Sequence, residues 1–179
     1  SEHVAAFRNH LLILSDRNKK VSNFIELWIA HMLHHPAMKP NAWLVLMSEE
    51  GAGKGTLVRI ITALVGKQKV KEICNVRRSL LGQFNQAMLD AFLVVIDEGA
   101  GKDMFELMEE LKHLITEDTV PVNQKNIAEK TVRSYARFMM TIQPRAVPTK
   151  KGDRRGVIIR CSDELIGDKA HWKNINTRI

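Results

Sequence analysis

Three glycines and one lysine stand together in the segment Ser48-Glu49-Glu50-Gly51-Ala52-Gly53-Lys54-Gly55-Thr56. Glycines at this density let backbone N–H groups turn towards an anion, and a lysine adds a positive point charge. The segment follows an apolar run, residues 43–47, and precedes an amphipathic run, residues 57–64. A strand, a glycine loop and a helix in this order predict a phosphate-binding P-loop, in which Lys54 reaches the β and γ phosphates of a nucleotide.

The nucleotide is therefore expected to bind Glu50, Gly51, Ala52, Gly53, Lys54, Gly55, Thr56 and Leu57. The segment departs twice from the general pattern G-x-x-x-x-G-K-[ST]. Ser48 replaces the usual first glycine, and Gly55 stands where the Mg²⁺-binding hydroxyl is usual, so Thr56 is the candidate for that hydroxyl. The GKGT ending also occurs in nucleotide kinases of the adenylate kinase type, so the loop alone does not name an enzyme.

An acidic pair, Asp97 and Glu98, follows directly after the apolar residues 91–96. A continuous run of β-forming residues predicts a buried parallel strand. A P-loop ATPase places its second acidic motif at the carboxyl end of such a strand, where Asp97 would hold Mg²⁺ and Glu98 would polarise the attacking water. The alternative, a pair of turn acids at the surface, is disfavoured by their position straight after the apolar run.

The elements that must position these residues alternate along the chain. Helical spacing of apolar residues predicts helices over residues 2–14, 21–33, 57–64, 80–90 and 104–115. Strands are predicted over residues 43–47, 70–74, 91–96, 136–142 and 157–160, and a β-hairpin over residues 119–123 and 131–132. The pattern predicts an α/β fold with a mainly parallel sheet between helices, in which an N-terminal helical segment, residues 1–40, precedes a P-loop core, residues 41–179.

Composition and charge restrict the class of protein. The 179 residues are enough for one well-packed domain, and 45% are hydrophobic, as in ordinary globular proteins. No apolar run reaches the length of a membrane span and no signal segment is visible, so a soluble, cytoplasmic protein without a membrane partner is expected. The chain begins at Ser1, which suggests a fragment of a longer polypeptide. Its net charge of +7, dense in residues 125–137 and 145–160, favours a nucleic-acid partner.

Five segments in order resemble the superfamily 3 helicase domain of phage and large-virus primase-helicases, the poxvirus-type group. They are GAGKGT, FNQAMLDAFLVVIDE, ELKHLITEDTVPVNQK, ARFMMTIQP and GDRRGVIIRCSDE, and the resemblance covers nearly all of residues 42–172. It implies an AAA+ type ATPase module that uses ATP and Mg²⁺ and assembles into a ring, usually a hexamer, around a nucleic-acid strand. The family usually carries a primase domain in the same polypeptide.

The resemblance also implies roles for single residues. Gln143 matches the family's sensor position, which is normally Asn; Gln is one methylene longer but keeps the amide. Arg154 and Arg155 match the arginine finger region, from which a guanidinium is offered to the γ-phosphate of the neighbouring subunit. Either arginine could fill that role.

The basic segment 125–133 matches the part of the family fold that faces the central channel. Lys125, Lys130 and Arg133 would contact the backbone of single-stranded or forked DNA, independently of sequence and with strong salt dependence. The whole pattern predicts an ATP-dependent helicase or translocase for viral, phage or mobile-element DNA replication, which hydrolyses ATP between subunits.

Two alternatives stay open. A nucleoside monophosphate kinase would explain the glycine loop and the arginines, but it would not predict the pair Asp97-Glu98 or a strand that ends in a sensor amide. A weakly catalytic DNA-binding ring or scaffold would explain Ser48, Gly55 and Gln143 as signs of lost hydrolysis.

Overall fold

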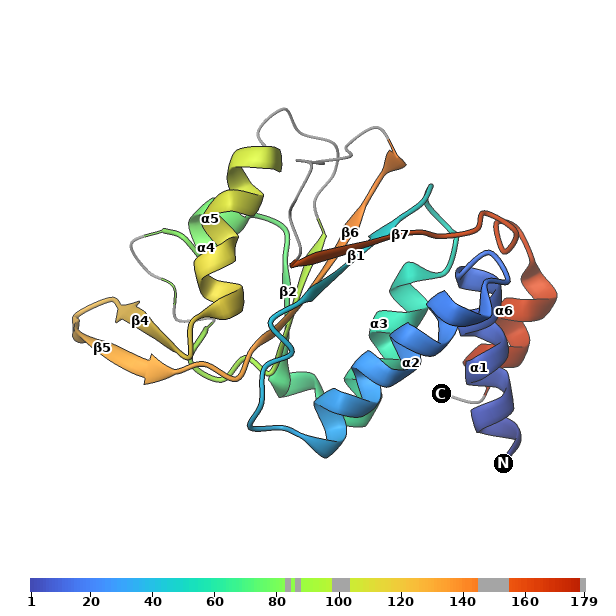
Figure 1. The fold of residues 1–179 in the computed structure, drawn as a ribbon, viewed down its shortest axis with the longest axis horizontal. Helices are drawn as coiled ribbons and strands as arrows, with labels where there is room; N and C mark the ends of the chain where they lie inside the picture. Colours follow the sequence, from blue (N-terminus) through green and yellow to red (C-terminus); the bar gives the residue numbers. More distant parts are fainter. Residues whose placement is uncertain (83–84, 86–87, 98–103, 145–154, 178–179) are drawn as a thin grey trace.

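The centre of the molecule is a five-stranded sheet in the order β2-β3-β6-β1-β7 (Figure 1). The computed structural model describes residues 1–82, 85, 88–97, 104–144 and 155–177, with the backbone alone for residues 104–108. The strands are β1 Trp43–Met47, β2 Val70–Ile73, β3 Leu93–Asp97, β6 Arg137–Ile142 and β7 Gly156–Arg160. All neighbouring strands pair in parallel. The predicted α/β fold with a mainly parallel sheet is confirmed.

Helices cover both faces of this sheet. They are α1 Glu2–Leu14, α2 Lys19–His34, α3 Lys54–Val65, α4 Val76–Ser79, α5 Met104–Thr116 and α6 Lys169–Asn176, with a 3₁₀ turn η1 at Lys67–Lys69. Successive residues of a strand point to opposite faces. On β1, Leu44 and Leu46 pack in a hydrophobic core with α1, α2 and α3, whereas Val45 and Met47 pack in a second core with α4 and α5. The central strands β1, β3 and β6 are thus covered on both sides, which explains their apolar runs.

A separate antiparallel hairpin extends from the α5 side of the sheet (Figure 1). Its strands are β4 Thr119–Gln124 and β5 Ile127–Arg133, joined by a turn in which Asn126 has a φ of +65°. The β4 residues Val120 and Val122 anchor the hairpin in the second core, whereas β5 is almost entirely exposed. The predicted hairpin is confirmed, and its outer strand presents its side chains to solvent.

The helix predicted over residues 80–90 is wrong for the described part of that segment. A short helix, Val76–Ser79, precedes it, and turns and bends follow. The buried Asn85 shows why: its Nδ2 donates to the carbonyl of Pro121 at 2.8 Å, and its Oδ1 accepts from the backbone N–H of Asn123 at 2.8 Å. These bonds hold the segment against β4, which is distant in the sequence, so tertiary contacts override the local helical pattern.

The C-terminal helix, the two cysteines and the lengths of the helices complete the description of the fold. The C-terminal helix α6 was not predicted, and it contributes to the site described below. Both cysteines are free thiols; Cys161 is buried, whereas Cys74, which follows the edge strand β2, is exposed. In the described residues, none of the helices combines the length and the apolar character that crossing a bilayer requires.

Candidate functional site

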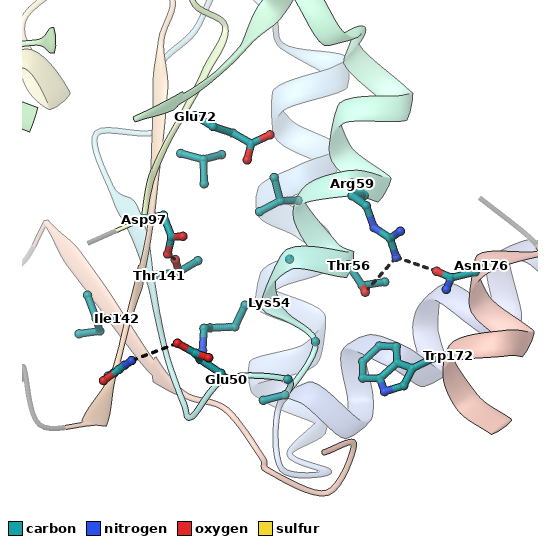
Figure 2. A pocket seen from close by; sticks show the side chains of 17 residues that line it. Glu50, Lys54, Thr56, Arg59, Glu72, Asp97, Thr141, Ile142, Trp172 and Asn176 are labelled. Carbon is teal, nitrogen blue, oxygen red and sulfur yellow. Dashed lines mark hydrogen bonds between the residues drawn. The ribbon is translucent and has the colours of Figure 1, made fainter. Parts of the chain in front are cut away.

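A cavity of about 760 Å³ opens where β1, β3 and β6 end and α3 begins (Figure 2). It is lined by Glu50, Gly51, Ala52, Gly53, Lys54, Gly55, Thr56, Val58, Arg59, Glu72, Val95, Asp97, Thr141, Ile142, Gln143, Trp172 and Asn176. The structure therefore brings the glycine loop together with Asp97 and Gln143, as expected for one shared site. Leu57 lies elsewhere: its side chain is fully buried in the core, and its backbone N–H donates to the carbonyl of Gly53 at 3.2 Å.

The glycine loop has a backbone conformation suited to an anion. Gly51 and Gly53 have φ values of +80° and +108°, which only glycine adopts without strain. Gly53 caps the N-terminus of α3, so the positive end of the helix dipole faces the cavity. Loops of this kind followed by a helix N-terminus bind phosphate groups through their N–H groups. The conformation supports the phosphate-binding role predicted for the loop.

Lys54 lies folded across the start of the loop. Its Nζ donates to the carbonyls of Ser48 and Glu49 at 2.8 and 2.9 Å and to the hydroxyl of Ser48 at 2.7 Å. Burial lowers the pKa of Lys54 from its usual value. The departure at position 48 thus has a structural consequence, since glycine would offer no hydroxyl to this ammonium group. Binding a phosphate requires Lys54 to exchange at least one of these bonds.

Asp97 and Thr141 form the acidic side of the cavity. They are direct partners in the register of β3 and β6, and the Thr141 hydroxyl donates to Asp97 Oδ1 at 2.5 Å. The Asp97 residue is exposed, whereas Thr141 is buried. Sequence reasoning missed Thr141, although a lone hydroxyl inside the apolar strand β6 was a visible signal. Glu98, the second member of the acidic pair, lies outside the described residues.

Gln143 follows β6 and faces the glycine loop. Its Nε2 donates to Glu50 Oε1 at 3.5 Å, the bond drawn at the lower left of Figure 2. The predicted sensor amide thus lines the cavity next to Glu50, a residue of the predicted phosphate loop. Gln143 is thus in reach of a ligand bound on that loop.

Thr56 lies on the opposite side of the α3 N-terminus from Asp97. Its hydroxyl accepts from Arg59 Nη2 at 3.3 Å, and the same nitrogen donates to Asn176 Oδ1 at 2.6 Å. Figure 2 shows Thr56 beside Arg59, Asn176 and Trp172, away from Asp97 and Thr141. The structure does not bring the Thr56 and Asp97 side chains together, although both were predicted to hold one Mg²⁺. Sequence reasoning missed Arg59, whose signal was its position one helical turn after Thr56.

A buried histidine, His10, contacts the backbone of the glycine loop. His10 of α1 is fully buried; its Nε2 lies 3.3 Å from the carbonyl oxygen of Gly53, and its Nδ1 lies 3.1 Å from Nε2 of His171 on α6. Since a carbonyl only accepts, Nε2 of His10 carries the proton and Nδ1 accepts from His171. Burial, and to a lesser degree His171, lower the pKa of His10 to about 4, so the ring is neutral near pH 7.

The predicted DNA-contacting residues lie on the hairpin, away from the cavity. Lys125 is in its turn, and Lys130 and Arg133 are on β5; all three are exposed. The Arg133 guanidinium lies 5.5 Å from the centre of the Tyr135 ring. All three cations are thus accessible to solvent on the hairpin.

Of the two predicted finger arginines, the structure describes Arg155, which directly precedes β7. Arg154 lies outside the described residues. Arg155 is half-buried, and its carbonyl accepts from the backbone N–H of Trp43 at 3.0 Å. Arg155 is not one of the described residues that line the cavity.

The fold and cavity define a class: a parallel α/β domain with a glycine loop and an acidic residue at the carboxyl edge of its sheet. Residues 46–155 match the model of a family described as "Family of unknown function (DUF5906)", and the chain belongs to that family. It is also similar to the "DNA Primase-polymerase" of Nitratiruptor phage NrS-1, with 26% identity over 162 residues, which cover 88% of this chain and 22% of that protein. The chain thus spans about a fifth of this curated relative.

Solved structures show the same fold. The apo C-terminal region of NrS-1 superposes with a TM-score of 0.82 and 22% identity, over 97% of this chain and 43% of that one. A JCV helicase, solved with a small molecule bound, has a TM-score of 0.60 and 15% identity, over 90% of this chain and 47% of that one. The α/β fold of this chain is thus shared with the C-terminal region of NrS-1 and with the JCV helicase.

Proposed function

We propose that this chain is the ATP-hydrolysing motor core of a helicase or translocase that acts in viral or phage DNA replication. The observation that carries the proposal is one cavity that joins the glycine loop, Lys54 and the Asp97–Thr141 pair at the carboxyl edge of a parallel sheet. Ligands bind at this edge in open α/β sheets. The fold shared with a viral helicase and with the phage primase-polymerase supports the same function.

The donor set on the acidic side suits Mg²⁺. This ion prefers carboxylate and hydroxyl oxygens, keeps several waters and completes its shell with substrate phosphates. Asp97 with Thr141 offers such oxygens, whereas Thr56 has a guanidinium 3.3 Å away that opposes a second cation. Asp97 and Thr141 would therefore hold the ion, which would supply neutralisation of charge on the transferring phosphoryl group.

The remaining residues have roles around the γ-phosphate. Lys54 would leave its loop carbonyls to bind the β and γ phosphates, and the loop N–H groups would hold the same oxygens. Glu98, which follows Asp97, would accept the proton of the attacking water, and the Gln143 amide would orient that water. Gln143 already lies beside Glu50 of the loop.

Assembly completes the proposed site. Arg154 or Arg155 would reach the γ-phosphate of the neighbouring subunit in a homo-oligomeric ring of about six copies, where a guanidinium stabilises the charge of the transition state. Lys125, Lys130 and Arg133 would meet the phosphates of single-stranded or forked DNA inside that ring. A primase linked in the same polypeptide is part of the proposal, because the similar phage protein bears that name.

The experiment is an ATPase assay over a range of protein concentrations, with and without single-stranded DNA. DNA-stimulated hydrolysis that rises steeply with concentration is expected, and Lys54→Ala and Glu98→Gln should each reduce it at least about a hundredfold. Lys67→Ala, an exposed lysine outside the cavity, serves as the matched control. Equal rates in parent and both variants would overturn the proposed site. Phosphate transfer to a nucleoside monophosphate would favour the kinase alternative, and an assembled parent without hydrolysis would favour the scaffold.

A further inference from the structure

One side of the cavity has no role in the proposed metal binding or in the hydrolysis step. Arg59 on the second turn of α3 and Trp172 and Asn176 on α6 line it, on the side where Thr56 points (Figure 2). We infer that this side binds the nucleoside end of the nucleotide, with the base against the Trp172 indole and Asn176 at the edge of the base. This inference rests on the proposed function, because it takes the ligand to be a nucleotide.

The orientation of the ligand follows from the two sides of the α3 N-terminus. The reacting phosphate must lie next to Asp97 and Thr141, where the oxygen ligands for a metal are. The intermediate phosphates then lie on the loop, since Gly51, Gly53 and the helix N-terminus are between the two sides. The rest of the molecule extends towards Thr56 and α6. The cavity volume of about 760 Å³ lies in the range of small-molecule sites, so a whole nucleotide fits one continuous space.

Trp172 is held in place before any ligand arrives. Its Nε1 donates to the carbonyl of Leu165 at 3.1 Å, and its ring makes edge contacts with His10 and His171 at centroid distances of 6.0 and 5.0 Å. A Cβ atom on Gly53 would lie 3.0 Å from the indole, so the ring touches the glycine loop. A rigid aromatic surface costs little conformational entropy on binding, and every base has a face that can pack on it.

Arg59 and Asn176 connect this surface to the loop. The two bonds of Arg59 Nη2, to Thr56 Oγ1 and Asn176 Oδ1, orient the guanidinium across the first turns of α3. A planar guanidinium in this place suits the oxygens of the phosphate nearest the sugar. Because Asn176 Oδ1 accepts from Arg59, its Nδ2 points away from that bond and offers donors to acceptor atoms on a base.

The experiment distinguishes binding of the nucleoside from binding of the phosphates. Calorimetric titrations of the full chain measure its affinity for ATP and for inorganic tripolyphosphate, both with Mg²⁺. Trp172→Leu and Asn176→Ala are each expected to weaken ATP binding roughly tenfold and to leave tripolyphosphate binding within about twofold. Asn174→Ala is the matched control, because Asn174 is exposed on the same helix and does not line the cavity. ATP, but not tripolyphosphate, should also change the tryptophan emission of the parent and not that of Trp172→Leu.

The inference would be overturned if the variants weakened binding of ATP and of tripolyphosphate equally, or weakened neither. Residues with a merely structural role would not affect binding of the two ligands differently. If Trp172→Leu unfolds, Asn176→Ala with its control carries the same comparison. A parent that binds ATP in this pattern but hydrolyses none would leave the inference intact and remove the motor function. A parent that binds neither ligand would overturn both.

Discussion

The imidazole Nε2 of His10 lies 3.3 Å from the carbonyl oxygen of Gly53, so the first helix of the chain supports the glycine loop directly. His171 holds the other ring nitrogen at 3.1 Å. A Cβ atom at position 53 would lie 2.7 Å from the His10 ring, which leaves no space for a side chain. Helices from the two ends of the described chain thus meet next to Gly53, the N-cap residue of α3.

This contact predicts that acid destabilises the protein. The pKa of His10 is lowered from its usual 6.5 to about 4, so the folded state keeps the ring neutral while the unfolded state gains a proton below pH 6.5. The contribution of His10 to stability is therefore fully present above pH 6.5 and decreases towards pH 4. Between pH 7 and pH 5 the free energy of unfolding should decrease by about 2 kcal/mol from this residue, as measured by urea denaturation.

His10→Gln is the control for that measurement, because glutamine keeps an N–H donor for Gly53 and does not titrate. The variant should show a shallower dependence of stability on pH over the same interval. Equal slopes in the parent and in His10→Gln would show that other groups cause the acid sensitivity.

The bond between Ser48 and Lys54 predicts that a substitution at Ser48 lowers the free energy of unfolding but has little effect on ATP affinity. Ser48→Ala removes one of the three acceptors that hold Lys54 Nζ, and the buried bond should contribute about 1 kcal/mol to the free energy of unfolding. Affinity for ATP should stay within about threefold, because Lys54 exchanges such bonds for phosphate oxygens. Chemical denaturation and calorimetric titration measure the two quantities. A large loss of ATP affinity in this variant would mean that the Ser48 hydroxyl itself binds the nucleotide.

A pair of threonine variants tests which of the two hydroxyl groups, that of Thr141 or that of Thr56, contributes to Mg²⁺ binding. Thr141→Val should raise the Mg²⁺ concentration needed for half-maximal ATPase activity about tenfold, since Thr141 contacts Asp97. Thr56→Val should leave that concentration within about twofold, because its hydroxyl faces Arg59. Both residues are buried, and valine keeps their shape, so each is the control for the other. The reverse result would support the magnesium role that the sequence pattern predicts for Thr56.

The exposed hairpin predicts a specific salt dependence of DNA binding. Lys125→Ala and Lys130→Ala should each weaken binding to single-stranded DNA and reduce the slope of log K against log salt by roughly 0.7. The losses should be similar for oligonucleotides of different sequence, because phosphate contacts do not read bases. Lys20→Ala, an exposed lysine of α2, should leave the slope unchanged. A slope that neither hairpin variant alters would place the DNA surface elsewhere.

Much of the fold could be predicted because its signals are local. Apolar runs without alternation predicted the buried parallel strands, and the glycines predicted the turn before α3. The helix predicted over residues 80–90 was wrong because the backbone conformation of this segment depends on Asn85. The side-chain amide of Asn85 bonds to backbone groups of β4 more than thirty positions away. No helical pattern within the segment contains that information.

The sequence by itself determined which strands are buried on both faces, that a glycine loop joins the first strand to a helix, and that an acid follows another strand. These properties arise from the side-chain period and from the backbone freedom of glycine, which act over a few residues. Only the tertiary structure decided that Thr141 rather than Thr56 meets Asp97, and that His10 and Trp172 lie against Gly53. The physical reason is that strand register and helix packing select which distant side chains share one edge of the sheet.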